Sequence, residues 1–196
     1  MRLTKRFSLV VFLIPLAGGE AAAAVPSPSS SRVPAVVVGN IGGAPIGAGF
    51  IVVVRKMSND PVPGADVQLI FPATGPRPLL EQETGTTMNC ATRTMSRLAD
   101  GNGIAVFHPR IAGFANLPAV DVRADGLLLR SVSARSTDLD GDGTVSLLDF
   151  HRFAQNFLRA PAAPETDYDQ NGRTDAWDFD LFRREFVARA RGVACP

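Results

Sequence analysis

The sequence predicts a two-domain protein, in which an all-β sandwich is followed by a small all-α unit built on two acidic loops. Three observations predict this fold class. Short alternating segments separated by turn signals fill residues 35–136. An acidic twelve-residue pattern that begins at Asp138 returns at Asp167, twenty-nine residues later. Each copy runs into a segment whose phenylalanines recur at helical spacing. We therefore expect a β domain over 35–136 and a helical domain over 137–196.

The N-terminus has the pattern of a secretory signal peptide. Three basic residues precede an apolar run over residues 7–17, and small residues follow it. Eleven apolar residues are fewer than the ~20 that a membrane-spanning helix needs. We therefore expect residues 1–24 to be removed, leaving a Pro/Ser linker over 25–34 and a secreted or cell-surface protein with no membrane span. A retained N-terminal anchor is the alternative.

Six segments rich in β-branched and apolar residues are the expected strands. They cover residues 35–38, 50–55, 65–71, 103–108, 119–123 and 127–133. Regularly spaced short strands favour a sandwich, and the polar piece between 72 and 96 is either a loop or contains an edge strand. The stretches PVPGADVQLIF and DGNGIAVFHP resemble the Ig-like domains of bacterial surface proteins, which implies an Ig-like sandwich.

The chain contains two cysteines, Cys90 and Cys195. In an oxidising compartment we expect them to form a disulfide that ties the C-terminal tail to the middle of the chain. A chain-entropy argument assigns about 4.7 kcal/mol to closing a loop of roughly 100 residues. Two unpaired thiols are the alternative.

No residue pattern in the β segment predicts catalysis. Its carboxylates occur mostly in turns or singly on strands, and the two histidines, His108 and His151, stand at a strand end and on the polar side of an expected helix. The glycine-rich run GNIGGAPIGAG leads into strand-like FIVVVR instead of a helix, which favours a hairpin over a phosphate loop. The segment also lacks the Trp and Tyr that form sugar-binding platforms. We expect a protein that is not an enzyme.

Net charge gives no indication of nucleic-acid binding. The formal charge is +1 and falls to about −1 when the signal peptide is removed, so no basic patch is expected. Residues 137–196 hold 11 acidic residues and 7 arginines, a net charge of −4. Two calcium ions would neutralise that charge.

The twelve-residue repeats DLDGDGTVSLLD and DYDQNGRTDAWD have the spacing of EF-hand-type calcium loops. Such loops take oxygen ligands from positions 1, 3, 5, 7, 9 and 12, and they need glycine at position 6. Here the glycines are Gly143 and Gly172. The expected ligands are Asp138, Asp140, Asp142, Thr144, Ser146 and Asp149 in the first loop, and Asp167, Asp169, Asn171, Arg173, Asp175 and Asp178 in the second. We predict two bound Ca²⁺ ions; acidic turns without metal are the alternative.

The first loop is expected to bind calcium more tightly, because positions 1, 3, 5 and 12 offer four carboxylates there, whereas the second loop has three and Asn171. Asp175 at position 9 of the second loop would narrow this difference. Each loop is followed by one apolar helical face. The repeated phenylalanines of these faces are Phe150, Phe153 and Phe157, and then Phe179, Phe182 and Phe186. The connection APAAP over residues 160–164 separates the two helices, whose apolar faces we expect to pack together.

A loop followed by only its exit helix, twice, with Asp at position 12, resembles the type I dockerin family over residues 137–190. The resemblance implies a calcium-folded module of a secreted bacterial protein with a structural or protein–protein interaction role. It also implies an alternative function as an accessory component of a polysaccharide-degrading assembly that docks to a cohesin-like domain.

The resemblance implies a partner-binding face at the start of each helix and on the second helix. Dockerins place small hydroxyl residues just before the closing Asp and a basic pair on the exit helix. Here the corresponding residues are Leu147, Leu148, Ala176, Trp177, Arg183 and Arg184. Only the two arginines match the family pattern; Ala154 and Gln155 stand where the first helix would carry its basic pair. The alternative to a cohesin-like partner is that the repeat closes the C-terminal end of the protein.

Overall fold

The computed structural model describes residues 24–42, 49–80, 82–159, 161, 163–193 and 195. The expected signal peptide, apart from Ala24, lies outside the described residues. So do most of the glycine-rich run and two residues of the APAAP connection.

The described chain is mainly β-structure, followed by two short α-helices and one 3-10 turn. The strands are β1 (Val36–Gly39), β2 (Phe50–Val53), β3 (Asp66–Ile70), β4 (Arg77–Pro78), β5 (Thr87–Asn89), β6 (Thr94–Leu98), β7 (Ile104–Phe107), β8 (Ile111–Ala112), β9 (Ala115–Ala124) and β10 (Leu127–Ser136). The helices are α1 (Leu147–Asn156), η1 (Pro164–Thr166) and α2 (Ala176–Ala188).

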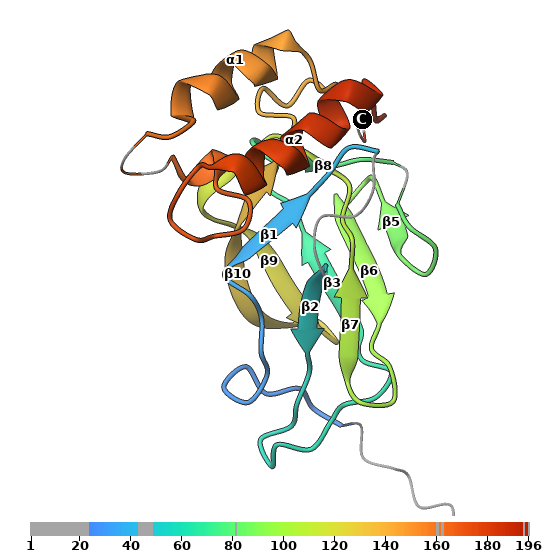
Figure 1. Cartoon of the computed structure of the whole chain (residues 1–196). Helices are drawn as coiled ribbons and strands as arrows, with labels where there is room; N and C mark the ends of the chain where they lie inside the picture. Colours follow the sequence, from blue (N-terminus) through green and yellow to red (C-terminus); the bar gives the residue numbers. More distant parts are fainter. Residues whose placement is uncertain are drawn as a thin grey trace, which may run out of the picture.

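One six-stranded sheet dominates the fold, with the strand order β1-β10-β9-β3-β6-β5. All its neighbouring strands are antiparallel except β1, which runs parallel to β10. A ribbon of β2 and β7 lies against this sheet, and β4 pairs with β8 (Figure 1). The polar segment between 72 and 96 contains β5, which forms the edge of the sheet.

The main core lies between the sheet and the β2–β7 ribbon. Alternation along the strands turns every second side chain inward, as in β10, where Val132, Ala134 and Ser136 are buried while the residues between them are partly exposed. Phe50 and Phe107 of the ribbon complete this apolar core. The residues on the other face of β10 are therefore available to contact the C-terminal segment.

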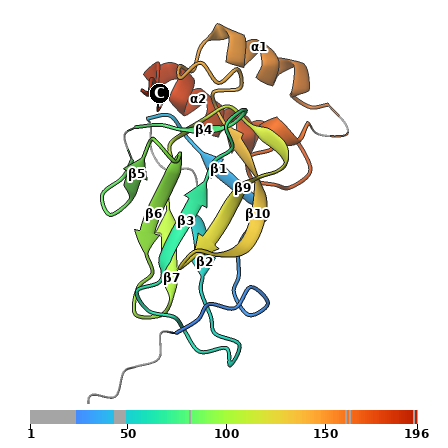
Figure 2. The same cartoon turned by 180° about the vertical axis from the view of Figure 1, so that it is seen from behind.

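The expected fold class, an all-β Ig-like sandwich followed by a separate all-α dockerin-like module, is wrong. The strands form one dominant sheet and a two-stranded ribbon instead of two comparable sheets. The helices do not form a module with a core of their own. Phe153 and Phe182 share a buried cluster with Ile41, Leu79 and Ala112 from the β region. Both helices lie at one end of the strands (Figures 1 and 2).

The physical reason for this difference is that two short helices bury too little apolar surface to stand alone. The carboxylate of Glu185 on α2 accepts backbone N–H groups of Ile41 and Gly42, at 3.3 and 3.2 Å. Tyr168, which is buried, donates its hydroxyl to the carbonyl of Ser136 at the end of β10. These contacts join the helical segment to the β region.

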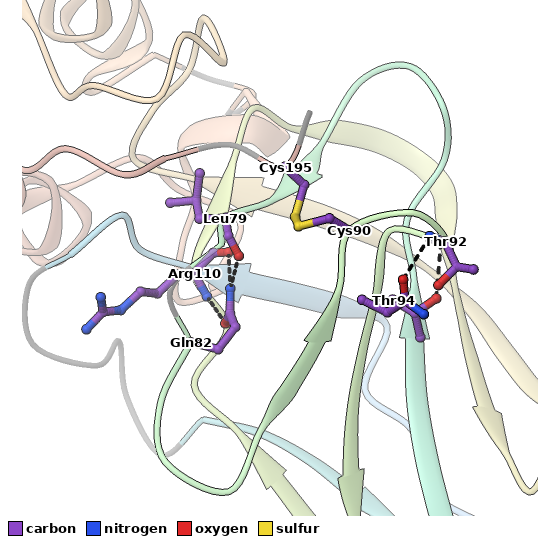
Figure 3. The surroundings of a disulfide bond; sticks show 8 residues. Leu79, Gln82, Cys90, Thr92, Thr94, Arg110 and Cys195 are labelled. Carbon is purple, nitrogen blue, oxygen red and sulfur yellow. Dashed lines mark hydrogen bonds between the residues drawn. A yellow bond between two sulfur atoms is a disulfide. The ribbon is translucent and has the colours of Figure 1, made fainter.

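The chain after α2 returns across the β region and is fixed there. Gly192 donates its N–H to the carbonyl of Gly143 at 2.9 Å, and Leu80 donates to the carbonyl of Val193 at 2.7 Å. A disulfide joins Cys90 to Cys195, consistent with the expected bridge (Figure 3). In the described part of the chain, no helix has the length and apolar character needed to cross a membrane.

A substitution at Gly192 measures how tightly this C-terminal segment packs. A Cβ added there would clash with Cδ1 of Leu79 and would lie 3.2 Å from its Cγ and 3.3 Å from Cγ2 of Ile41, and both of these side chains are buried. We expect Gly192→Ala to lower the free energy of unfolding by about 1–3 kcal/mol, as overpacking does. Gly101→Ala is the matched control, because no atom lies within 4 Å of its added Cβ, and its effect should stay within about 0.5 kcal/mol. Equal denaturation midpoints for the two variants would contradict the described packing.

Candidate metal centre

Each acidic loop is held by the first turn of the helix that follows it. Ser146 and Asp175 are the N-caps of α1 and α2, and Asp149 and Asp178 occupy the third helical position in a reciprocal capping box. The side chain of each N-cap accepts a backbone N–H near the helix start, while the third residue accepts the N-cap N–H. The position-12 aspartates are therefore fixed by helix formation.

Three carboxylates converge in each loop. Oxygens of Asp138, Asp140 and Asp149 all lie within 4.8 Å of one another, and so do those of Asp167, Asp169 and Asp178. In both clusters the first and last aspartates are buried. The two clusters are thus equivalent members of the twenty-nine-residue repeat.

Backbone hydrogen bonds give the two loops nearly the same shape. Asp149 Oδ1 accepts N–H groups from positions 2 and 3 of its loop, and Asp178 Oδ1 does the same in the second loop. Asp138 Oδ2 accepts from Gly143 at 2.7 Å, and Asp167 Oδ2 accepts from Gly172 at 3.1 Å. The repeat seen in the sequence is therefore also a repeat of hydrogen-bonded structure.

The backbone conformation at position 6 explains why each loop has glycine there. Gly143 and Gly172 have φ angles of 92° and 83°, in the region that side chains other than glycine rarely adopt. These positive φ angles place the sharp turn of each loop at its position-6 glycine. This turn also brings the N–H of position 6 to the carboxylate of position 1.

The helices pack with an approximate two-fold relation. Phe153 stacks on its repeat equivalent Phe182, with ring centroids 5.0 Å apart. The ring centroids of Phe150 and Phe186 lie 5.6 Å apart, and those of Phe157 and Phe179 lie 5.9 Å apart. These two pairs are equivalent, because Phe179 and Phe186 are the repeat counterparts of Phe150 and Phe157. Packing of the two phenylalanine faces against each other agrees with the sequence expectation.

Each loop also pairs with the chain that follows the other repeat's helix. Val145, at position 8 of the first loop, donates its N–H to the carbonyl of Ala190 after α2. Leu158, after α1, donates to the carbonyl of Thr174, at position 8 of the second loop. The conformation of either loop therefore depends on the other repeat.

Burial makes one carboxylate in each cluster costly to ionise. Removal from water raises the pKa of Asp138 to about 7, although N–H groups from Gly143 and Gly141 oppose the change. Burial also raises the pKa of Asp178 above its usual range. Without a positive charge, each cluster would therefore be stabilised by holding protons.

The donor set fits a hard divalent cation. Every converging group is a carboxylate oxygen, the ligand type that Ca²⁺ prefers, and sulfur and imidazole donors are absent from both clusters. Buried, facing carboxylates are also the arrangement whose repulsion a divalent ion relieves.

The remaining expected ligands take supporting positions in the loops. Asp142 and Asn171 each accept the N–H of position 7, namely Thr144 and Arg173. Ser146 and Asp175 use a side-chain oxygen for helix capping. The carboxylate clusters therefore contain half of the twelve residues predicted from the sequence.

The residues of the expected partner face lie at the surface. Leu147, Leu148 and Trp177 are 72%, 64% and 72% exposed. Ala176 is also exposed, at the start of α2. Arg183 and Arg184 are exposed and both form ion pairs with Asp180.

Sequence reasoning missed Arg135, which lies near the end of β10. Its Nη1 is 3.8 Å from Oδ2 of Asp167, and both side chains are almost fully buried. No sequence signal indicates this contact, because it depends on η1 and the second loop folding back onto β10. Tyr168 and Leu139, the buried residues at position 2, were detectable as a further apolar match in the repeat.

Comparisons with known proteins identify no family. No family model and no curated protein matches the chain. One similar solved structure is the adhesin InvE of Yersinia pseudotuberculosis, with a TM-score of 0.27 and 18% identity over 57% of this chain. The match covers 26% of that adhesin chain, and a likeness at this TM-score supports no inference about fold or function.

The raised pKa of Asp138 predicts a pH-dependent stability in the metal-free protein. The folded pKa, about 7, exceeds the ordinary value of 3.8, so the folded state holds this proton more tightly than the unfolded state does. The free energy of unfolding should therefore fall as the pH rises from about 4 to about 7, by at most ~1.4 kcal/mol per pH unit for this group. Denaturant unfolding of metal-stripped protein across this range measures the slope. Asp138→Asn should flatten it, and an unchanged slope in that variant would contradict the assignment.

Proposed function

We propose that this protein is a secreted, non-enzymatic calcium-binding protein whose two loops each hold one Ca²⁺ and thereby order its helical segment. The supporting observation is the pair of three-carboxylate clusters, which are equivalent under the twenty-nine-residue repeat and carry matching hydrogen bonds. The likeness of these loops to those of type I dockerins also favours calcium. The proposed role is structural or in protein–protein interaction outside the cell.

Calcium would act on the fold through the first turns of the helices. Asp149 and Asp178 each take part in a carboxylate cluster and in a helix capping box. An ion that neutralises a cluster therefore also stabilises the start of a helix. Because α1 and α2 share a core with Leu79 and Ile41, this stabilisation extends to the β region.

The loops predict a stoichiometry of two Ca²⁺ per chain. Native mass spectrometry and calorimetry of the metal-stripped protein should both report two ions. Calcium at 100 times the dissociation constant should raise the free energy of unfolding by about 2.7 kcal/mol per site, because it binds only the folded loops. EDTA should lower the helical circular dichroism signal and the melting temperature.

Paired variants assign each ion to its loop. Asp138→Asn with Asp149→Asn should abolish one site, and Asp167→Asn with Asp178→Asn should abolish the other. Asp121→Asn is the control, because this carboxylate lies on β9, outside both loops, and should leave two ions bound. Melting and circular dichroism that do not respond to calcium or EDTA would contradict the proposal.

A second candidate function is docking to a cohesin-like domain as an accessory component of a polysaccharide-degrading assembly. The observation that favours it is the exposure of Leu147, Leu148 and Trp177 at the two helix starts. A neighbouring apolar groove of about 270 Å³ lies between the helices. It is lined by Phe150, Phe153, Ala154, Phe157 and Phe179. Large exposed apolar side chains beside such a groove are typical of an interaction surface.

Cohesin-type domains immobilised on resin test this candidate. The protein should bind in calcium and not in EDTA, because the helix starts depend on the loops. Leu148→Lys and Trp177→Lys should each weaken binding about tenfold or more, as expected when a central apolar contact is lost. Leu117→Lys is the matched control, since Leu117 is 78% exposed on β9. Failure of a broad cohesin panel to bind in calcium would leave only the structural role.

A further inference from the structure

We propose that Arg135 is a built-in countercharge of the second calcium loop, which makes this loop the weaker of two unequal sites. The inference rests on the proposed calcium function and adds a residue from the sheet, outside both loops, that sets the affinity of one of them. Arg135 lies near the end of β10, and its side chain is 11% exposed. Its Nη1 is 3.8 Å from a carboxylate oxygen of Asp167, which is itself 7% exposed.

The position of Arg135 follows from the alternation of β10. Ala134 and Ser136 point to the main core, so Arg135 points to the opposite face. That face is covered by η1 and the second loop, and Asn116 on β9 helps to hold η1 by donating to Glu165 at 3.1 Å. The guanidinium is thus enclosed between the sheet and the loop.

The guanidinium faces negative charge from the second loop and from η1. The carboxylates that act on it are Asp167 and Asp178 of the loop and Glu165 of η1. Its Nη1 is buried and makes no hydrogen bond, so the interaction with the loop is electrostatic in character. A buried cation that faces a carboxylate cluster already neutralises part of the charge that would attract a divalent ion.

The first loop has no equivalent cation at its carboxylates. Among the described residues, none of its four aspartates forms an ion pair. Arg77 and Arg152 approach this loop, but they donate to the backbone carbonyls of Gly141 and Leu139. Arg77 is partly buried and Arg152 is exposed, and neither guanidinium forms an ion pair with an aspartate of this loop. Within the residues that the structure describes, the first loop therefore has no cation paired directly with its carboxylates, whereas the second loop has Arg135.

Two consequences follow for metal binding. The first loop should bind calcium first, because no cation is paired directly with its carboxylates. The second loop should keep its shape without metal, because Arg135 offsets the repulsion between Asp167 and Asp178. The asymmetry thus depends on Arg135 as well as on the replacement of Asp142 by Asn171 at position 5 of the second loop.

Calorimetric calcium titrations of Arg135→Met and the wild type test the proposal. To isolate calcium binding at the second loop, the proteins with and without Arg135→Met both also carry Asp138→Asn and Asp149→Asn, which remove the first site. Arg135→Met should lower the dissociation constant on the order of tenfold. Arg130→Met is the matched control, because Arg130 lies on the same strand but is exposed and donates to Val33, and its removal should change the constant less than twofold. The inference would be overturned if Arg135→Met and wild type had equal calcium dissociation constants, or if Arg130→Met increased the calcium affinity as much as Arg135→Met does.

Melting temperatures separate an electrostatic role from a purely structural one. In the full chain, Arg135→Met should melt lower than wild type in EDTA, since it leaves Asp167 buried without a countercharge. When calcium is added, the melting temperature of this variant should rise by more than that of the wild type. A purely structural role predicts equal losses in both conditions and would overturn the proposal.

The wild-type protein provides a further test that needs no variant. Trp177 is the only tryptophan, and it directly precedes Asp178 of the second loop. Its fluorescence should change mainly during the second equivalent of added calcium. A change confined to the first equivalent would overturn the proposed order, while no calcium uptake at all would overturn the calcium function together with this inference.

Discussion

Repulsion between buried carboxylates is the constraint on which the C-terminal half of this protein depends. Each cluster places three acidic groups within 4.8 Å of one another, and in each cluster two of them are buried. The same carboxylates accept the hydrogen bonds that shape the loops and start the helices. Under the proposed function, relief of the repulsion and formation of the helices would therefore be one process, in which a proton, an arginine or a divalent cation supplies the compensating charge.

The helical segment extends the β fold instead of standing beside it. Phe153 and Phe182 stack on each other, yet their cluster also includes Leu79 and Ile41 from the β region. Glu185 caps the backbone after β1, and the chain after α2 returns to pair with the first loop. The loops are consequently connected to the end of the sheet by packed side chains and main-chain hydrogen bonds.

Local patterns predicted the elements of this structure better than their arrangement. The six expected strands correspond to β1, β2, β3, β7, β9 and β10, because alternation is visible within a short segment. The edge strand β5 and the start of its neighbour β6 lie in a polar stretch without a clear alternating pattern. They form strands because β6 pairs with β3 and β5 pairs with β6. The glycine turns and the convergence of Asp138 with Asp149 followed from loop spacing. The shared core and the contact of Arg135 with Asp167 join distant segments, which no local pattern records.

The bond between Cys90 and Cys195 makes the region between them a covalent ring that contains both loops and both helices. A single protease cut anywhere within this ring therefore releases no fragment, because the two pieces remain joined through sulfur. In an oxidising compartment, where thiol reductants are scarce, a nicked molecule would keep its acidic loops attached to the sheet.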